Sequence, residues 1–168
     1  MRRIAALSIA IMALAPAALA DLNSHDRKFI REAAMAGVFE VQANSLGRQK
    51  ARNPEVKQHS MHMVTDHTQA NRELTALARQ EGIRPPTIMS PKQRSIMTKL
   101  RRLRGAAFDR EHAKTQLKAH EEAVALFSKQ IAKGKDRQLV TWAKRTLPKL
   151  EEHLHMWQRA NSEVMNRP

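Results

Sequence analysis

The sequence contains no cysteine and no tyrosine, and its 168 residues include only five glycines and 4% aromatic residues. The absence of cysteine excludes disulfides, thiolate metal sites, iron–sulfur clusters and cysteine nucleophiles. Scarce aromatic residues disfavour a β-sandwich or β-barrel. There is also no glycine-rich phosphate loop, no G-x-S-x-G turn and no H-E-x-x-H motif, so the common nucleotide-binding, serine-hydrolase and zinc-protease signatures are missing.

Good helix-forming residues and an excess of positive charge dominate what is present. Alanine, leucine, lysine, arginine, glutamine and glutamate are abundant, and all favour helices. Lysine and arginine number 30 against 16 acidic residues, which gives a net charge of +14. Such a protein attracts polyanions, for example lipopolysaccharide, anionic lipid headgroups or acidic polysaccharide.

The first twenty residues have the pattern of a cleaved signal peptide. Basic residues at 2–3 precede an apolar run at 4–14, and Ala18-Leu19-Ala20 supplies small residues for signal peptidase. We expect cleavage after Ala20 and a single domain over residues 21–168. The expected location is periplasmic or secreted, and it includes peripheral contact with the outer membrane. The alternative is an N-terminal membrane anchor, for which the apolar run is short. No later segment is apolar enough to span a bilayer.

Periodicity and capping signals predict an all-α chain. Asn53-Pro54 is a typical helix start, Gly82 and Gly134 are typical helix ends, and Ser24 is a candidate N-cap. The expected helices cover residues 24–52, 54–81, 91–104, 107–133 and 137–164. Four of them are long and of similar length, which favours an up-down antiparallel four-helix bundle with the short helix inserted between the second and third long helices.

Each long helix carries a titratable residue near the middle of its apolar stripe. Glu40 lies 13 residues before Asn53, and His67 lies 14 residues after it. His120 and His153 stand at comparable distances from the turn at 134–136. In an antiparallel bundle the mismatches in height come to only about 1.5 and 4.5 Å, so all four should lie at one level.

A buried Glu/His cluster permits two interpretations. Glu40, His67, His120 and His153 can be direct ligands of zinc, copper, iron or manganese. They can equally form a hydrogen-bonded network without metal. Asp66 lies beside His67 and Asp109 lies about 16 Å from His120 along the same helix face; both are candidate supporting or structural partners.

Histidine and methionine also gather in the second helix. His59 and Met63 share a face with His67, and imidazole with thioether suits copper. The alternative is that methionine fills gaps in the core and that the histidine is merely polar.

The short helix is strongly basic. No acidic residue occurs between Glu81 and Asp109, and a dock for an anionic surface is one interpretation, a solvated helix the other. No aromatic residues alternate with the charges, so no specific nucleic acid is expected. The basic residues of this helix are Lys92, Arg94, Lys99, Arg101, Arg102 and Arg104.

Several segments resemble one known family. They are Asp26–Phe29, Ala33–Val41 with Glu40, Lys50–Lys57 with Asn53-Pro54, Met63–Leu74 with Asp66-His67, and Leu147–Leu154 with Pro148 and His153, together with Phe108-Asp109, His120 and Leu126-Phe127. Together they resemble the domain-of-unknown-function 4142 family, exported bacterial proteins often labelled outer-membrane proteins. The resemblance implies an envelope location and a ferritin-like helical bundle, and it supplies no activity. The family's recurrent polar positions fall here on Glu40, Asp66, His67, Asp109, His120 and His153.

The sequence therefore favours an exported four-helix protein that binds a transition metal in its core without catalysing a reaction. The alternative is an envelope protein that docks on anionic lipid or polysaccharide through the basic helix, with a purely structural Glu/His cluster. An oxidative enzyme would need an open metal position and a route for substrate, and the sequence indicates neither.

Overall fold

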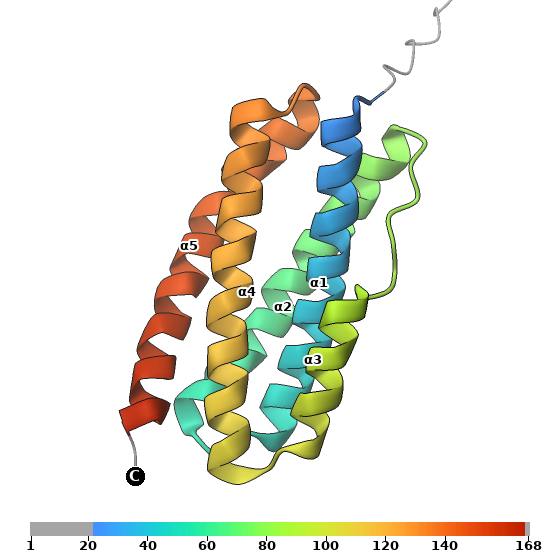
Figure 1. Ribbon diagram of the computed structural model, residues 1–168. Helices are drawn as coiled ribbons and strands as arrows, with labels where there is room; N and C mark the ends of the chain where they lie inside the picture. Colours follow the sequence, from blue (N-terminus) through green and yellow to red (C-terminus); the bar gives the residue numbers. More distant parts are fainter. Residues whose placement is uncertain (1–21, 167–168) are drawn as a thin grey trace, which may run out of the picture.

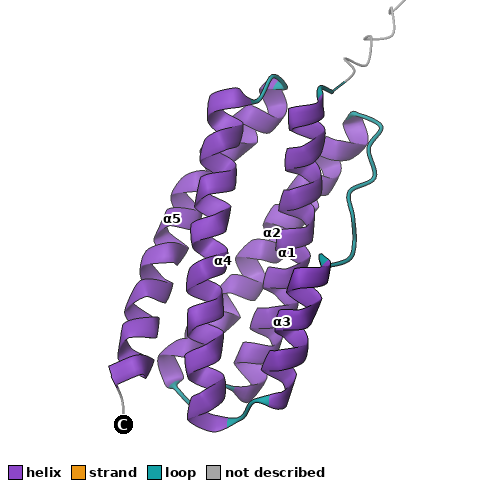
Figure 2. Ribbon diagram, viewed as in Figure 1, coloured by secondary structure: helices purple, strands orange, loops and turns teal. Residues whose placement is uncertain are grey.

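The computed structural model describes residues 22–166, and this part of the chain is all-α, without strands (Figures 1 and 2). The expected signal peptide lies outside the described residues. Within residues 22–166 no helix is both long and apolar enough to cross a membrane. The helices are α1 (Ser24–Lys50), α2 (Pro54–Gln80), α3 (Pro91–Arg102), α4 (Gly105–Lys133) and α5 (Arg137–Asn166).

Two antiparallel helical hairpins build the bundle, α1 with α2 and α4 with α5 (Figure 1). Packing is densest within each hairpin, while α1 against α4 and α2 against α5 join the two. The connection from α2 to α4 runs back along the bundle and contains α3, which contacts α1 and α4. Consequently α2 and α4 run in the same direction, whereas the up-down interpretation expected consecutive long helices to alternate.

The helix ends differ from the sequence expectations by a few residues, and two of the differences have clear causes. Asn23, rather than Ser24, caps α1, because its side chain accepts from the N–H groups of His25 and Asp26. The first helix stops at Lys50 instead of residue 52, since the next residues are extended and Asp109 binds the N–H groups of Arg52 and Asn53.

Buried carboxylates hold the two hairpin turns at opposite ends of the bundle. Asp109 of α4 accepts from the Asn53 N–H at 2.8 Å, so it holds the turn between α1 and α2. Asp26 of α1 accepts from the N–H groups of Lys135 and Asp136 and from Gln130, so it holds the turn between α4 and α5. Each hairpin thus fixes the turn of the other through backbone donors that would otherwise lack a partner.

The apolar core is divided into two clusters. One contains Phe39, Met63 and Trp157, and the other contains Phe29, Leu74, Phe127, Trp142 and Leu150, each with further apolar neighbours. Along α2, α4 and α5 a buried histidine separates the members of the two clusters, and on α1 Glu40 lies next to Phe39, near the point where the clusters meet. These residues form a polar layer across the middle of the bundle: Glu40, His67, His120 and His153.

Candidate metal centre

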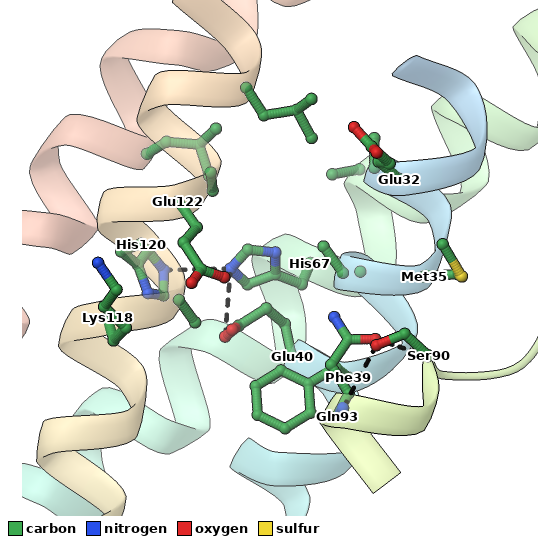
Figure 3. Close-up of a pocket in the computed structure, with 18 of the residues that line it drawn as sticks. Glu32, Met35, Phe39, Glu40, His67, Ser90, Gln93, Lys118, His120 and Glu122 are labelled. Carbon is green, nitrogen blue, oxygen red and sulfur yellow. Dashed lines mark hydrogen bonds and ion pairs between the residues drawn. The ribbon is translucent and has the colours of Figure 1, made fainter. Parts of the chain in front are cut away.

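Four helices each contribute one buried side chain to the polar layer. His67 Nε2 lies 3.4 Å from His120 Nε2 and 3.8 Å from Glu40 Oε2 (Figure 3). The ring of His153 lies 5.5 Å from the rings of His67 and His120, measured between centroids. One nitrogen from each of the three imidazoles falls within 4.8 Å of the others, so the structure brings the three histidines together, and Glu40 joins them through its contact with His67.

Hydrogen bonds fix which nitrogen of His120 and His153 carries the proton. His120 Nδ1 lies 2.9 Å from the Gln116 carbonyl oxygen, which only accepts, so Nδ1–H donates and Nε2 keeps its lone pair. His153 Nε2 lies 3.0 Å from Asp66 Oδ2, and the carboxylate likewise accepts from Nε2–H. Nδ1 of His153 is left buried and without a hydrogen-bond partner. Metal-binding histidines are typically oriented in this way by a second hydrogen bond.

Glu40 is held by a buried amide chain. Asn44, one turn further along α1, donates to Glu40 Oε2 at 3.0 Å and to the Gln116 side-chain oxygen at 2.8 Å. The backbone carbonyl of Gln116 is the acceptor for His120, as described above. The amide chain therefore ties the carboxyl group on α1 to the histidine on α4.

Burial keeps the cluster uncharged near neutral pH. Desolvation raises the pKa of Glu40 to about 8, against the smaller opposing effect of its amide hydrogen bonds. Desolvation, followed by repulsion from the neighbouring histidines, holds the pKa of His67 well below its usual range. Burial lowers the pKa of His120 to about 4 and also lowers that of His153, although Asp66 opposes the shift at His153. The contact between His67 and Glu40 thus joins two neutral groups, and neutral imidazole is the form that binds metals.

A cavity of about 550 Å³ between α1 and α4 leads to the layer (Figure 3). Glu40, His67 and His120 form part of its wall, and residues near the start of α3, including Ser90 and Gln93, lie at its rim. The cluster is therefore reachable from one side of the bundle, a route that the sequence did not indicate.

The two candidate supporting aspartates have different roles. Asp66 contacts the cluster directly, because it accepts from His153. It also lies 3.2 Å from Nε2 of His62, a residue that the sequence analysis did not single out. Asp109 is buried in the turn contact described above and does not reach the histidines; its position is structural.

On the histidine–methionine face of α2, His59 and Met63 have neighbours other than His67. Met63 is fully buried in an apolar cluster. His59 Nε2 lies 3.2 Å from Glu55, and its ring packs edge-on against Trp157. Among the histidines and acidic residues of the described chain, the two groupings suited to a metal ion do not include His59.

The basic side chains of α3 are all exposed. Lys92 pairs with Glu122 at 3.0 Å and Lys99 with Glu111 at 2.6 Å, so these two attach α3 to α4. Arg94 donates to the Met89 carbonyl. Within residues 22–166, Arg101, Arg102 and Arg104 have no ion pair to an acidic side chain.

Three polar residues with notable contacts were not selected as candidates from the sequence. Asn44 and His62 each stand four residues from a candidate, Glu40 and Asp66 respectively, on the same helix face. That spacing of four residues could have identified both as neighbours of the candidates. His112 is also buried, stacks on Phe108 and lies 3.1 Å from Ser60 Oγ; burial lowers its pKa to about 3.

Comparison with known proteins agrees with the resemblance seen in the sequence. The model of a family described as a domain of unknown function, DUF4142, matches residues 12–160. Neither the curated proteins nor the solved structures gave a match. Because the match spans nearly the whole chain, the protein belongs to the DUF4142 family.

Proposed function

We propose that this protein binds one transition-metal ion in the middle of its helical bundle, through His67, His120 and His153, with Glu40 as the fourth ligand. The proposal is for metal binding alone, without an assigned reaction. In the structure the three imidazoles offer nitrogens within 4.8 Å of one another. Glu40 loses its proton on binding, because a nearby cation reverses the effect of burial on a carboxyl group.

The arrangement of the histidine nitrogens carries the proposal. The Gln116 carbonyl accepts from His120 Nδ1–H, and Asp66 accepts from His153 Nε2–H. The nitrogens that keep a lone pair for a metal ion are therefore His120 Nε2 and the unpartnered His153 Nδ1. The His67–His120 separation of 3.4 Å is close to the roughly 3.3 Å between two nitrogens bound to one tetrahedral zinc ion. The buried His153 Nδ1 has no hydrogen-bond partner, so its lone pair is available to a metal ion.

The donor set favours zinc or copper. Three imidazoles with one carboxylate suit both ions, whereas manganese prefers more oxygen ligands. Iron remains compatible with nitrogen and oxygen donors but commonly takes additional ligands, for which the cavity beside Glu40 offers space.

Metal content of the untagged protein tests the proposal. We expect about one equivalent of ion after incubation with zinc or copper and gel filtration, and near-complete loss in the His67→Ala/His120→Ala variant. His155→Ala is the matched control, because His155 is exposed and its Nδ1 bonds only to Gln158. Equal metal content in all three proteins would refute the proposal.

The location and the finer fold class are also proposed. Export is supported by the signal-like segment at residues 1–20, and mass spectrometry of the protein recovered from a bacterial periplasm should find a chain beginning at Asp21. A ferritin-like arrangement is supported by the long connection between α2 and α4, since ferritin-like bundles have one such crossover. A recovered chain that still begins at residue 1 would contradict export with cleavage.

A second candidate function rests on α3. The exposed Arg101 and Arg102 at its end, with Arg104 just beyond it, support docking on an anionic lipid or polysaccharide surface. Sedimentation with anionic vesicles should then be strong at low salt, should weaken as salt is added and should be lost when the three arginines are changed to glutamate. Absence of binding at low salt would eliminate this candidate without affecting the metal proposal.

A further inference from the structure

A second cluster of metal-binding side chains lies on the other side of His153. Asp66 Oδ2 is 3.2 Å from His62 Nε2 and 3.0 Å from His153 Nε2. One donor atom from each of the three residues lies within 4.8 Å of the others. Two imidazoles that converge on one carboxylate oxygen make a donor set suited to zinc or copper.

Exposure changes steadily across this outer cluster. The side chain of His62 is 44% exposed and that of Asp66 is 23% exposed, while that of His153 is only 1% exposed. An ion bound here would keep water on its open positions. The outer cluster therefore has one end in solvent and the other at the buried centre.

His153 belongs to both groups of ligands. Its Nε2 contacts Asp66 in the outer cluster, and its Nδ1 is buried without a partner. Its ring centroid lies 5.6 Å from that of His62 and 5.5 Å from that of His67. A single imidazole thus separates a partly exposed cation site from a buried one.

The cavity between α1 and α4 is a less suitable route for a cation. Much of its wall is apolar, with Ala36, Leu74, Ala123, Leu126 and Phe127 among the lining residues. A hydrated cation loses favourable hydration along such a surface, whereas the outer cluster offers replacement ligands. The ligand chemistry therefore favours the side of His62, although Glu32, Glu111 and Glu122 also line the cavity.

From this geometry we propose that His62, Asp66 and His153 form an outer metal site through which the ion is passed to the buried centre. At the outer site His153 would bind through Nε2, so the proton that Nε2 donates to Asp66 in the metal-free protein moves to Nδ1. When the ion passes to Nδ1 at the buried centre, the proton returns to Nε2 and its hydrogen bond with Asp66 is restored. The loading role rests on the proposed function of the buried site, while cation binding at the outer site does not. Lys149 holds the outer site in competition with the metal, because its ammonium lies 3.8 Å from Asp66 Oδ2 and 3.3 Å from Glu152 Oε2. When an ion arrives, Lys149 can remain paired with Glu152.

Loading kinetics test the transfer. Cobalt(II) is a suitable probe, because its visible absorption reports a tetrahedral nitrogen–oxygen site, and mixing can be followed by stopped flow. We expect His62→Gln to slow loading about tenfold or more while the final occupancy stays the same. Lys149→Met should load several-fold faster, since it removes a positive charge beside Asp66. His155→Gln, which changes an exposed histidine outside both clusters, should load at the wild-type rate.

A second measurement isolates the outer site. In the His67→Ala/His120→Ala background, calorimetry with zinc should show one weak site that disappears on adding His62→Gln. Loading of His62→Gln at the wild-type rate would overturn the transfer role and leave the buried site intact. Failure of the wild type to load cobalt at the centre would instead refute the proposed function, and calorimetry would still decide whether the outer site binds. Absence of zinc binding in the double variant would overturn the outer site itself.

Discussion

The bundle buries carboxyl groups both at its ends and in its middle, and the two settings differ in how the groups are satisfied. Asp26 and Asp109 lie at the ends and accept hydrogen bonds from the backbone N–H groups of turns. Glu40 lies in the middle, where the Asn44 amide donates to it and the neutral His67 lies 3.8 Å away. The carboxylates at the ends are matched by fixed donors of the fold, whereas the middle is arranged so that a cation would complete it.

Matched amide substitutions should separate the two settings most strongly. Asp109→Asn places an amide where two backbone N–H groups donate, so we expect the free energy of unfolding to fall by about 3 kcal/mol. Glu40→Gln should instead raise it by about 3 kcal/mol at pH 7, because the carboxyl group stays largely neutral in the folded protein, with its pKa near 8, but ionises in the unfolded chain, a cost that the amide does not have. Urea denaturation of the metal-free proteins measures both. Equal losses would show that the two settings do not differ.

Asp66 adds to the comparison a carboxylate that would affect metal binding by orienting His153. Asp66→Asn retains the size of the side chain but weakens the orientation of His153, so affinity for zinc should drop by about ten- to a hundredfold. Competition with a chelator measures the affinity. Glu151→Gln, a change of an exposed carboxylate on α5 outside both clusters, is the control and should leave affinity within about twofold. An unchanged affinity in Asp66→Asn would remove Asp66 from the site.

The pH dependence of stability should identify Glu40 in the metal-free protein. Its pKa is raised from 4.5 to about 8 by burial, so between these values the folded state binds more protons than the unfolded state and stability falls as pH rises. Histidines with lowered pKa values have the opposite sign, and their effect extends a little above the unfolded pKa of about 6.5. From pH 6.5 to 8.5 we therefore expect the wild type to lose about 2 kcal/mol relative to Glu40→Gln, in which the histidines titrate alike.

Glu40→Gln is the comparison protein for this pH dependence. Its amide does not titrate, so its stability should not fall over the same range and should follow only the histidines, which raise stability slightly as pH increases. Urea midpoints at the two pH values give the result. A parallel decline in both proteins would assign the effect to other groups.

The exposed ion pairs of α3 should give the smallest effect. Lys92 and Glu122 are both largely in solvent, so Lys92→Ala should alter the free energy of unfolding by about 0.5 kcal/mol or less. Thermal denaturation at low and high salt measures it. A loss comparable to that of Asp109→Asn would mean that attachment of α3 supports the whole bundle.

The sequence was sufficient for the helices and for the level of the buried polar layer. Helical period and the two short turns determine the heights of Glu40, His67, His120 and His153, because rise per residue is nearly constant. It did not show that the connection containing α3 returns along the bundle, since an extended segment of that length can take several courses. Nor did it show the cavity, which depends on how far α1 and α4 stand apart.

Side-chain partners were predicted less well than helix positions. Asp109 shares a face with His120 but turns to the hairpin connection, because the N–H groups of Arg52 and Asn53 need an acceptor there. The sequence offered no reason to select His62, because its contact with Asp66 matters only when Asp66 also contacts His153 on another helix. Such choices depend on contacts between helices that lie far apart in the sequence.

Anomalous diffraction from crystals of the zinc- or copper-loaded protein tests the central claim most directly. The account predicts one strong peak among His67, His120 and His153, about 2.0–2.2 Å from the ligating atoms, with Glu40 turned toward it. Strong peaks confined to exposed histidines such as His155, with the His67–His120 hydrogen bond still in place, would contradict it.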